Sequence, residues 1–184
     1  VGLFVSVLDQ TAVFVAIPAL SKHFQSPIQN VSLVLIGYML TTGALLLPMG
    51  RAADIFGLNK IHTLGLVIFV ISAGLAGASF TLTGLILSRM LQGVGAAMVQ
   101  ATAMAIVTSV FPEKERGKAI GALMTVIGVA AASAPIISGV VQTFLGWRYV
   151  FFMSLPFGIF AVLASLMVLK AQGPAWNIDS GQLT

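Results

Sequence analysis

The chain has 184 residues, of which 58% are hydrophobic and only 8% are charged. Its mean hydropathy of +1.05 excludes a soluble globular domain, because such domains contain about 25% charged residues. The absence of cysteine excludes a disulfide framework and a thiolate metal site. The net charge of +4 comes from only nine Lys and Arg, which form no stripe of the kind that binds nucleic acid.

Apolar stretches long enough to cross a bilayer, which takes about 20 helical residues, occur six times along the chain. They are continuous runs without alternation, so they predict helices and not a transmembrane β-barrel. We therefore predict an all-α integral membrane protein with a six-helix bundle over residues 1–170. The polar segment 171–184 is expected to be a cytoplasmic linker toward spans outside this chain. The chain begins with Val inside an apolar segment that contains an acid, which favours a trimmed N-terminus over a signal peptide. The predicted spans are Val1–Leu20, Val31–Pro48, Ile61–Ser79, Leu82–Val110, Ala119–Gln142 and Tyr149–Leu169.

The basic residues between the predicted spans are distributed unequally. Cytoplasmic connections are enriched in Lys and Arg, so the richer side is expected to face the cytoplasm. This places both ends of the chain in the cytoplasm and the protein in the cell membrane, unless the asymmetry is a chance effect of small numbers. The richer side holds Arg51, Lys60, Lys114, Arg116, Lys118 and Lys170, and the poorer side holds Lys22 and Arg148.

Two charged residues, Asp9 and Arg89, lie inside predicted spans. A charge at mid-membrane costs roughly 2.5–3.5 kcal/mol on insertion scales and usually lines a pathway or cavity. At 1.5 Å per residue, Asp9 lies about 17 Å below an outer end at Leu20, and Arg89 about 10 Å below Leu82. A pair across the bundle interior is therefore geometrically possible. The alternative is that Asp9 lies near the cytoplasmic interface and that Arg89 extends outward to polar headgroups.

Several segments carry motifs in a consistent order: LDQTAVFVAIP in the first span, GRAADIFGLNK after the second, LSRMLQGVGAA in the fourth and GALMTVIGVAAASAPIISG in the fifth. Together they resemble the N-terminal half of a major facilitator superfamily transporter, and they are most similar to the fourteen-span drug–proton antiporters. The matching positions are Asp9, Thr11, Ala16, Pro18, Gly50, Asp54, Gly57, Arg89, Gln92, Gly93, Gly95, Gly121, Pro135 and Gly139.

This chain also departs from the family's motifs. The resemblance implies a bundle of two inverted three-helix repeats, with the fifth helix acting as a gasket and hinge and the loop after the second span as a cytoplasmic latch. The loss of basic residues from this loop puts the strength of the latch in question. The loss of several glycines from the fifth helix puts its role as a hinge in question. The substituted positions are Phe14, Ile55, Leu58, Asn59, Ala130, Ala134 and Ser138.

The intramembrane charges suggest the chemistry of a carrier. An acid influenced by both burial and a neighbouring cation can exchange a proton for a substrate when a midplane cavity changes sides. Asp9 and Arg89 are the predicted proton-coupling residues, and Gln92 and Thr11 are expected to orient water or a polar substrate group. Met39, Phe14 and other apolar side chains are candidates to line a site for lipophilic compounds, or simply to contact lipid and other helices.

The remaining candidates concern gating and packing. Gly57 suits a turn with positive φ, and Asp54 is expected to cap the third helix or to pair with Arg116. Gly93 and Gly95 are expected to allow close helix approach. Pro135 is expected to bend the fifth helix, which serves either as a gasket and hinge or simply as a helix with ordinary small-residue packing. The gate-loop candidates are Gly50, Asp54, Gly57, Lys60 and Arg116, and the packing and hinge candidates are Gly93, Gly95, Gly121, Pro135 and Gly139.

These expectations combine into a proton-coupled secondary transporter that exports drugs or other small molecules by alternating access. Its expected partners are the bilayer, protons, a lipophilic substrate and a missing C-terminal half or another membrane subunit; no nucleic acid, metal or cofactor is expected. The alternative is a non-transporting subunit that uses half of the transporter fold in a larger membrane complex. An enzyme is not expected, because the residues form no nucleophile–base arrangement or carboxylate cluster.

Overall fold

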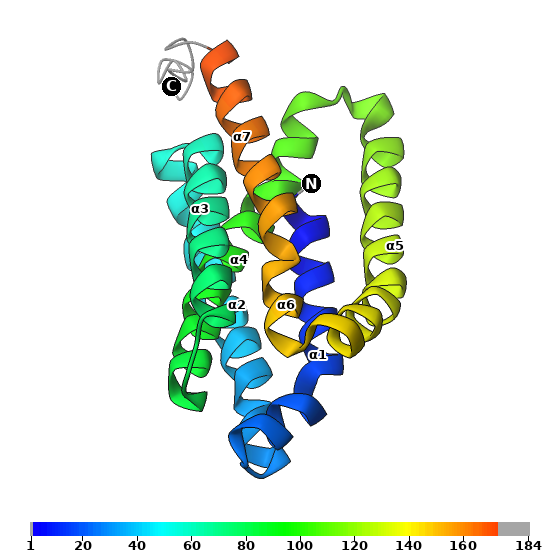
Figure 1. Cartoon of the computed structure of the whole chain (residues 1–184). Helices are drawn as coiled ribbons and strands as arrows, with labels where there is room; N and C mark the ends of the chain where they lie inside the picture. The colour runs from blue at the N-terminus through cyan, green and yellow to red at the C-terminus, as the bar shows by residue number, and fades with distance from the viewer. Residues whose placement is uncertain (1, 173–184) are drawn as a thin grey trace.

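The computed structural model describes residues 2–172, and this part of the chain is helical throughout apart from short connections (Figure 1). Six stretches are long and apolar enough to cross a membrane, as the sequence predicts. The helices are α1 (Gly2–Phe24), α2 (Ile28–Phe56), α3 (Leu58–Gly77), α4 (Leu82–Val110), α5 (Glu113–Leu145), α6 (Trp147–Phe152) and α7 (Ser154–Gln172).

Helix α4 is the centre of the packing. It lies against both α2 and α3, whereas α5 packs mainly on α1 and α7 packs on α3. Figure 1 shows α5 standing at one side of the bundle with α1 between it and the other helices. In the most apolar stretch of α5 only 11% of the residues are buried, whereas 50% are buried in the corresponding stretch of α4. Most of the α5 surface is thus free to contact lipid or another part of a larger protein.

The last predicted span is interrupted, which the sequence analysis did not predict. A turn at Met153 divides it into α6 and α7. Pro156 explains the interruption, because proline has no N–H for the carbonyl four residues earlier and its ring clashes with that carbonyl. Here that carbonyl belongs to Phe152, the last residue of α6. The interruption makes α6 a short separate helix whose side chains enter the bundle.

Glycines set the distance between α3 and α4. A Cβ atom added to Gly95 would lie 2.6 Å from the carbonyl oxygen of Gly65 and 2.7 Å from the backbone nitrogen of Phe69. Such distances are too short for any side chain, so the two backbones are in direct contact. Small residues commonly allow this in membranes, where dispersion between closely packed backbones replaces the hydrophobic effect as the driving force.

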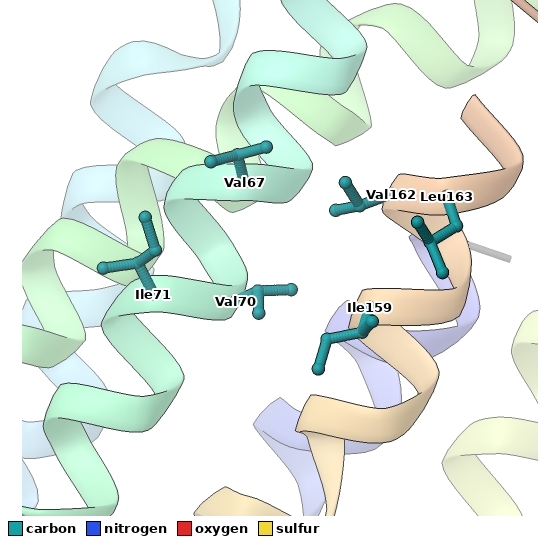
Figure 2. Close-up of a pocket in the computed structure, with 6 residues that line it drawn as sticks. All are labelled: Val67, Val70, Ile71, Ile159, Val162 and Leu163. Carbon is teal, nitrogen blue, oxygen red and sulfur yellow. The ribbon is translucent and has the colours of Figure 1, made fainter. Parts of the chain in front are cut away.

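An apolar groove separates α3 from α7 on the outer surface of the bundle (Figure 2). Its volume is about 150 Å³. The helices approach closely at Gly158, where a Cβ would lie 2.5 Å from Val70, and again where the hydroxyls of Thr63 and Ser165 share a hydrogen bond of 2.5 Å. The groove is the space left between these two contacts. Its lining residues are Val67, Val70, Ile71, Ile159, Val162 and Leu163.

Arg148 fastens α6 to the C-terminal end of α3. Its Nη1 atom donates to the carbonyl oxygens of Gly77 at 3.0 Å and Ser79 at 2.9 Å. Its guanidinium carbon lies 4.7 Å from the ring centroid of Trp147 and 5.3 Å from that of Phe80. These contacts satisfy carbonyls that a helix end leaves free and fix where α6 enters the bundle.

Candidate functional site

The charges of Asp9 and Arg89 meet inside the bundle. Arg89 Nη1 lies 2.5 Å from Asp9 Oδ2, and neither side chain has any exposed surface. The same nitrogen donates to Gln92 Oε1 at 2.5 Å. Arg89 and Gln92 are three residues apart on α4 and so share a helix face, which directs both toward α1. The alternative in which Arg89 extends outward to headgroups is wrong for this bundle.

Several polar atoms of this cluster have no hydrogen-bond partner among the described residues. A buried pair is stable only when its geometry is good and its other polar atoms are satisfied, and each unsatisfied buried group costs about 1–3 kcal/mol. The cluster therefore retains capacity to bind a proton, a water molecule or a polar group of a substrate. The unpartnered atoms are Asp9 Oδ1, Arg89 Nε and Nη2, Gln92 Nε2 and Tyr38 Oη.

Two aromatic residues of the cluster, Tyr38 and Phe151, were missed by the sequence analysis. The guanidinium carbon of Arg89 lies 4.3 Å from the ring centroid of Tyr38 and 5.9 Å from that of Phe151. A periodicity signal could have indicated Tyr38, since it falls on the i, i+3, i+4 pattern that marks a buried helix face. That pattern in α2 consists of Val31, Val34, Leu35, Tyr38 and Thr42, all of which are buried. Phe151 gave no such signal, because its position depends on the interruption after α6.

Gly93 brings α2 close to this cluster. A Cβ on Gly93 would lie 2.8 Å from the carbonyl oxygen of Tyr38. The Thr42 hydroxyl lies within hydrogen-bond distance of the Tyr38 carbonyl at 2.8 Å and the Gly93 carbonyl at 3.2 Å. The two glycines of the fourth-span motif thus allow neighbouring helices to approach α4 closely on two sides. Gly93 faces α2 and Gly95 faces α3.

Thr11 does not join the ion pair. Its hydroxyl donates to the carbonyl of Val7, 2.9 Å away in the same helix, a common position for a threonine in a helix. Phe14 and Met39, the apolar lining candidates, are 68% and 57% exposed in this bundle. Neither side chain is part of the core that the described residues form.

The gate loop differs in part from the prediction. Gly57 joins α2 to α3 with φ of +100°, so the expectation of positive φ is confirmed. The prediction that Asp54 caps α3 is wrong, because α2 continues to Phe56 and the capping position is Gly57, with no side-chain cap bond. The predicted pairing of Asp54 with Arg116 does not form in the described part of the chain, where Arg116 pairs with Glu113.

Arg116 forms its contacts within its own segment. Its Nη1 lies 3.8 Å from Glu113 Oε1 and its Nε donates to the Phe111 carbonyl at 3.2 Å. Both partners precede it by one turn or slightly more, which is why it does not extend to α2. Lys60 is exposed and Gly50 has open space around its Cβ position. None of these contacts links the connection between α2 and α3 to α5.

Helix α5 packs through alanine and serine positions and not through its predicted glycines. Cβ atoms added to Gly121 and Gly139 would meet no heavy atom within 4 Å. Pro135 is exposed, and Figure 1 shows α5 changing direction in its yellow C-terminal part. The face toward α1 is formed by Ala130, Ala134 and Ser138, which are fully buried.

The Ser138 hydroxyl donates to the carbonyl of Ala12 on α1 at 2.8 Å. Replacing Ser138 with alanine is expected to lower the free energy of unfolding by about 0.5–1.5 kcal/mol, the net value of one hydrogen bond. Ser133 is the matched control, because the bond that its hydroxyl makes among the described residues lies within α5, to the carbonyl of Ala130 at 3.3 Å. Chemical unfolding of the purified protein in detergent compares the two alanine variants. Equal stability of the two would contradict a contribution from the contact between helices.

Comparison with known proteins identifies the architecture. The sequence pattern of the Major Facilitator Superfamily matches residues 1–182. The riboflavin transporter RibZ of Clostridioides difficile (strain 630) is 37% identical over 92% of this chain and 37% of its own length. The tetracenomycin C resistance and export protein of Streptomyces glaucescens is 31% identical over 92% of this chain and 31% of its own length.

A solved structure agrees with this in fold. A bacterial homologue of the human lysosomal transporter Spinster, in an inward-facing and unoccupied conformation, matches with a TM-score of 0.72 at 18% identity, over 90% of this chain and 40% of that one. The chain spans well under half of the length of these relatives. Their fold is that of transporters and not of enzymes. The chain belongs to the Major Facilitator Superfamily, and its six spans match the N-terminal half of that fold.

Proposed function

We propose that the chain is the N-terminal bundle of a proton-coupled exporter of small molecules, working by alternating access. The observation that carries this proposal is the fully buried pair of Asp9 and Arg89, completed by Gln92. A carboxylate inside a membrane bundle is costly and usually functional, and Oδ1 of this one has no hydrogen-bond partner among the described residues. A proton on that carboxyl would neutralise it and release Arg89.

The proposed substrates are small molecules that contain fused rings. Two of the relatives are named for riboflavin transport and for tetracenomycin C export, and both of these compounds contain fused rings. The exposed Phe14 and Met39 side chains provide apolar contacts of the kind that suits such rings. A second bundle, contributed by the rest of a longer chain, is needed to enclose the cavity.

The proposed location is the cell membrane, with the end of the bundle near Gly57 in the cytoplasm. Basic residues gather at this end, as they do on the cytoplasmic side of most membrane proteins. They are Arg51, Lys60, Lys114, Arg116 and Lys118, together with Lys170 in the last turn of α7, whereas Lys22 and Arg148 belong to the opposite end.

Replacing Asp9 with asparagine is expected to abolish transport driven by a proton gradient, because an amide keeps the shape of the carboxyl but carries no exchangeable charge. Inside-out vesicles containing the full-length protein receive a proton gradient, and accumulation of riboflavin and of ethidium is followed by fluorescence. The rate for the faster probe is expected to fall by more than about tenfold, equivalent to 1.4 kcal/mol in the barrier.

The control is Glu115→Gln, which alters an exposed carboxylate in the first turn of α5. This variant tests whether any loss of an acid has the same effect. Proton-driven transport that is unchanged in Asp9→Asn would overturn the proposal. So would a wild-type protein that inserts into the vesicles but moves neither probe in response to the gradient, which is the outcome that a non-transporting subunit predicts.

A further inference from the structure

The guanidinium group of Arg89 is held by hydrogen bonds at only one of its nitrogens. Nη1 bonds both Asp9 Oδ2 and Gln92 Oε1, while Nε and Nη2 have no partner among the described residues. Hydrogen bonds through a single nitrogen do not fix the plane of the group, which remains free to pivot about Nη1. Some other contact must set its orientation.

Tyr38 and Phe151 provide that contact. The guanidinium carbon lies 4.3 Å from the Tyr38 ring centroid and 5.9 Å from the Phe151 centroid, both within the range of about 6 Å for cation–π attraction. A planar guanidinium can place its face on an aromatic ring while the N–H groups in its plane bond a carboxylate. Removal of water strengthens this attraction, and both rings are almost completely buried.

Both rings are themselves held in place by the packing. The backbone at Tyr38 is tied to α4 through the close approach of Gly93 and the hydroxyl of Thr42. Phe151 lies edge-on to Trp147, with centroids 6.0 Å apart, on the short helix that Arg148 fastens to α3. The Tyr38 hydroxyl has no hydrogen-bond partner within residues 2–172, so the ring is the part of this side chain that contacts Arg89.

We infer that Tyr38 is a positioning residue for Arg89, and that its ring, assisted by that of Phe151, holds the guanidinium so that Nη1 remains directed at Asp9. Without the ring the guanidinium pivots, and the Asp9 carboxyl spends more time unpaired. The geometry carries this inference independently of transport. Its consequence for proton coupling rests on the proposed function above.

The test measures how readily Asp9 reacts with dicyclohexylcarbodiimide, a reagent that modifies unpaired, protonated carboxyls in apolar surroundings. Labelling of the Asp9 peptide in the full-length protein is followed by mass spectrometry, with Asp9→Asn as the blank. Tyr38→Leu is expected to raise the labelling rate by about threefold to thirtyfold, the range that corresponds to cation–π contacts from exposed to desolvated sites. Tyr38→Phe keeps the ring and is expected to label at close to the wild-type rate.

A second substitution guards against misfolding. Tyr38→Met fills the space with a flexible side chain but has no ring, and it is expected to label as Tyr38→Leu does. Equal labelling of the ring-containing and ringless variants, including no labelling in any of them, overturns the inference. So does faster labelling in Tyr38→Phe, which would assign the effect to the hydroxyl.

The outcomes for this inference and for the proposed function are separable. If Asp9→Asn stops transport but the Tyr38 variants label alike, the coupling role stands and the positioning role fails. If Asp9→Asn transports normally while labelling depends on the ring, the positioning role stands and the proposed function fails.

Discussion

Replacing Arg89 with methionine is expected to lower the free energy of unfolding by about 3–5 kcal/mol, because it leaves the Asp9 carboxylate buried without its partner. Methionine is a suitable replacement, since its flexible side chain fills irregular space. Both residues are fully buried and 2.5 Å apart, so solvent does not screen the loss. Chemical unfolding of the purified full-length protein in detergent measures the effect.

The double variant Asp9→Asn with Arg89→Met separates the charge from the packing. Removing both charges leaves no unpaired ion, so the double variant is expected to be more stable than Arg89→Met alone, and its loss of stability is expected to differ from the sum of the two single losses by about 0.5–3 kcal/mol, the usual coupling between residues in contact. Arg51→Met is the control, because Arg51 is exposed near the end of α2, where substitutions usually change stability by less than about 0.5 kcal/mol. A double variant no more stable than Arg89→Met would contradict a direct charge interaction.

The second large effect is expected from Gly95→Ala. The added methyl group would lie 2.6 Å from the Gly65 carbonyl oxygen and 2.7 Å from the Phe69 nitrogen. Because both neighbours are backbone atoms of α3, no side-chain rotation can relieve the contact and the helices must separate. Overpacking of this kind costs about 1–3 kcal/mol and sometimes more. Thermal unfolding in detergent measures it.

Gly74→Ala is the matched control for Gly95→Ala. Gly74 also lies within a helix, but a Cβ added to it meets nothing within 4 Å. Both substitutions gain the same helix propensity, about 1 kcal/mol, so the difference between them isolates the contact between α3 and α4. If Gly95→Ala proves as stable as Gly74→Ala, the backbones do not touch as described.

The helical content was predictable from hydropathy, because a membrane admits few structures other than helices that satisfy their own backbone. The depths of Asp9 and Arg89 in the membrane could be estimated, since helical rise fixes depth once the span ends are known, but their pairing was only one of two alternatives. The division of the last span was not predictable, although Pro156 is visible in the sequence. Proline inside a membrane helix is often tolerated, so its presence alone does not predict an interruption.

Contacts between distant helices limited the prediction of the site. Tyr38 approaches Arg89 because Gly93 lets α2 come close, and a single sequence does not state which helices are neighbours. The capping role expected for Asp54 failed for a local reason, since α2 extends past it to Phe56. The packing expected of Gly121 and Gly139 was found at Ala130, Ala134 and Ser138, on a different face of the same helix.

The hydrogen bond from Ser138 to Ala12 also bears on how α1 is held. Ala12 follows Asp9 by three residues, so the carbonyl that accepts from α5 and the carboxylate that binds α4 lie within one turn of each other. A rotation of α1 that carried Asp9 away from Arg89 would also move the Ala12 carbonyl away from Ser138. The rotation of α1 about its own axis is therefore fixed by contacts with α4 and α5 together. Helix α5 is attached to α1 within one turn of the residue that forms the charge pair at the centre of the bundle.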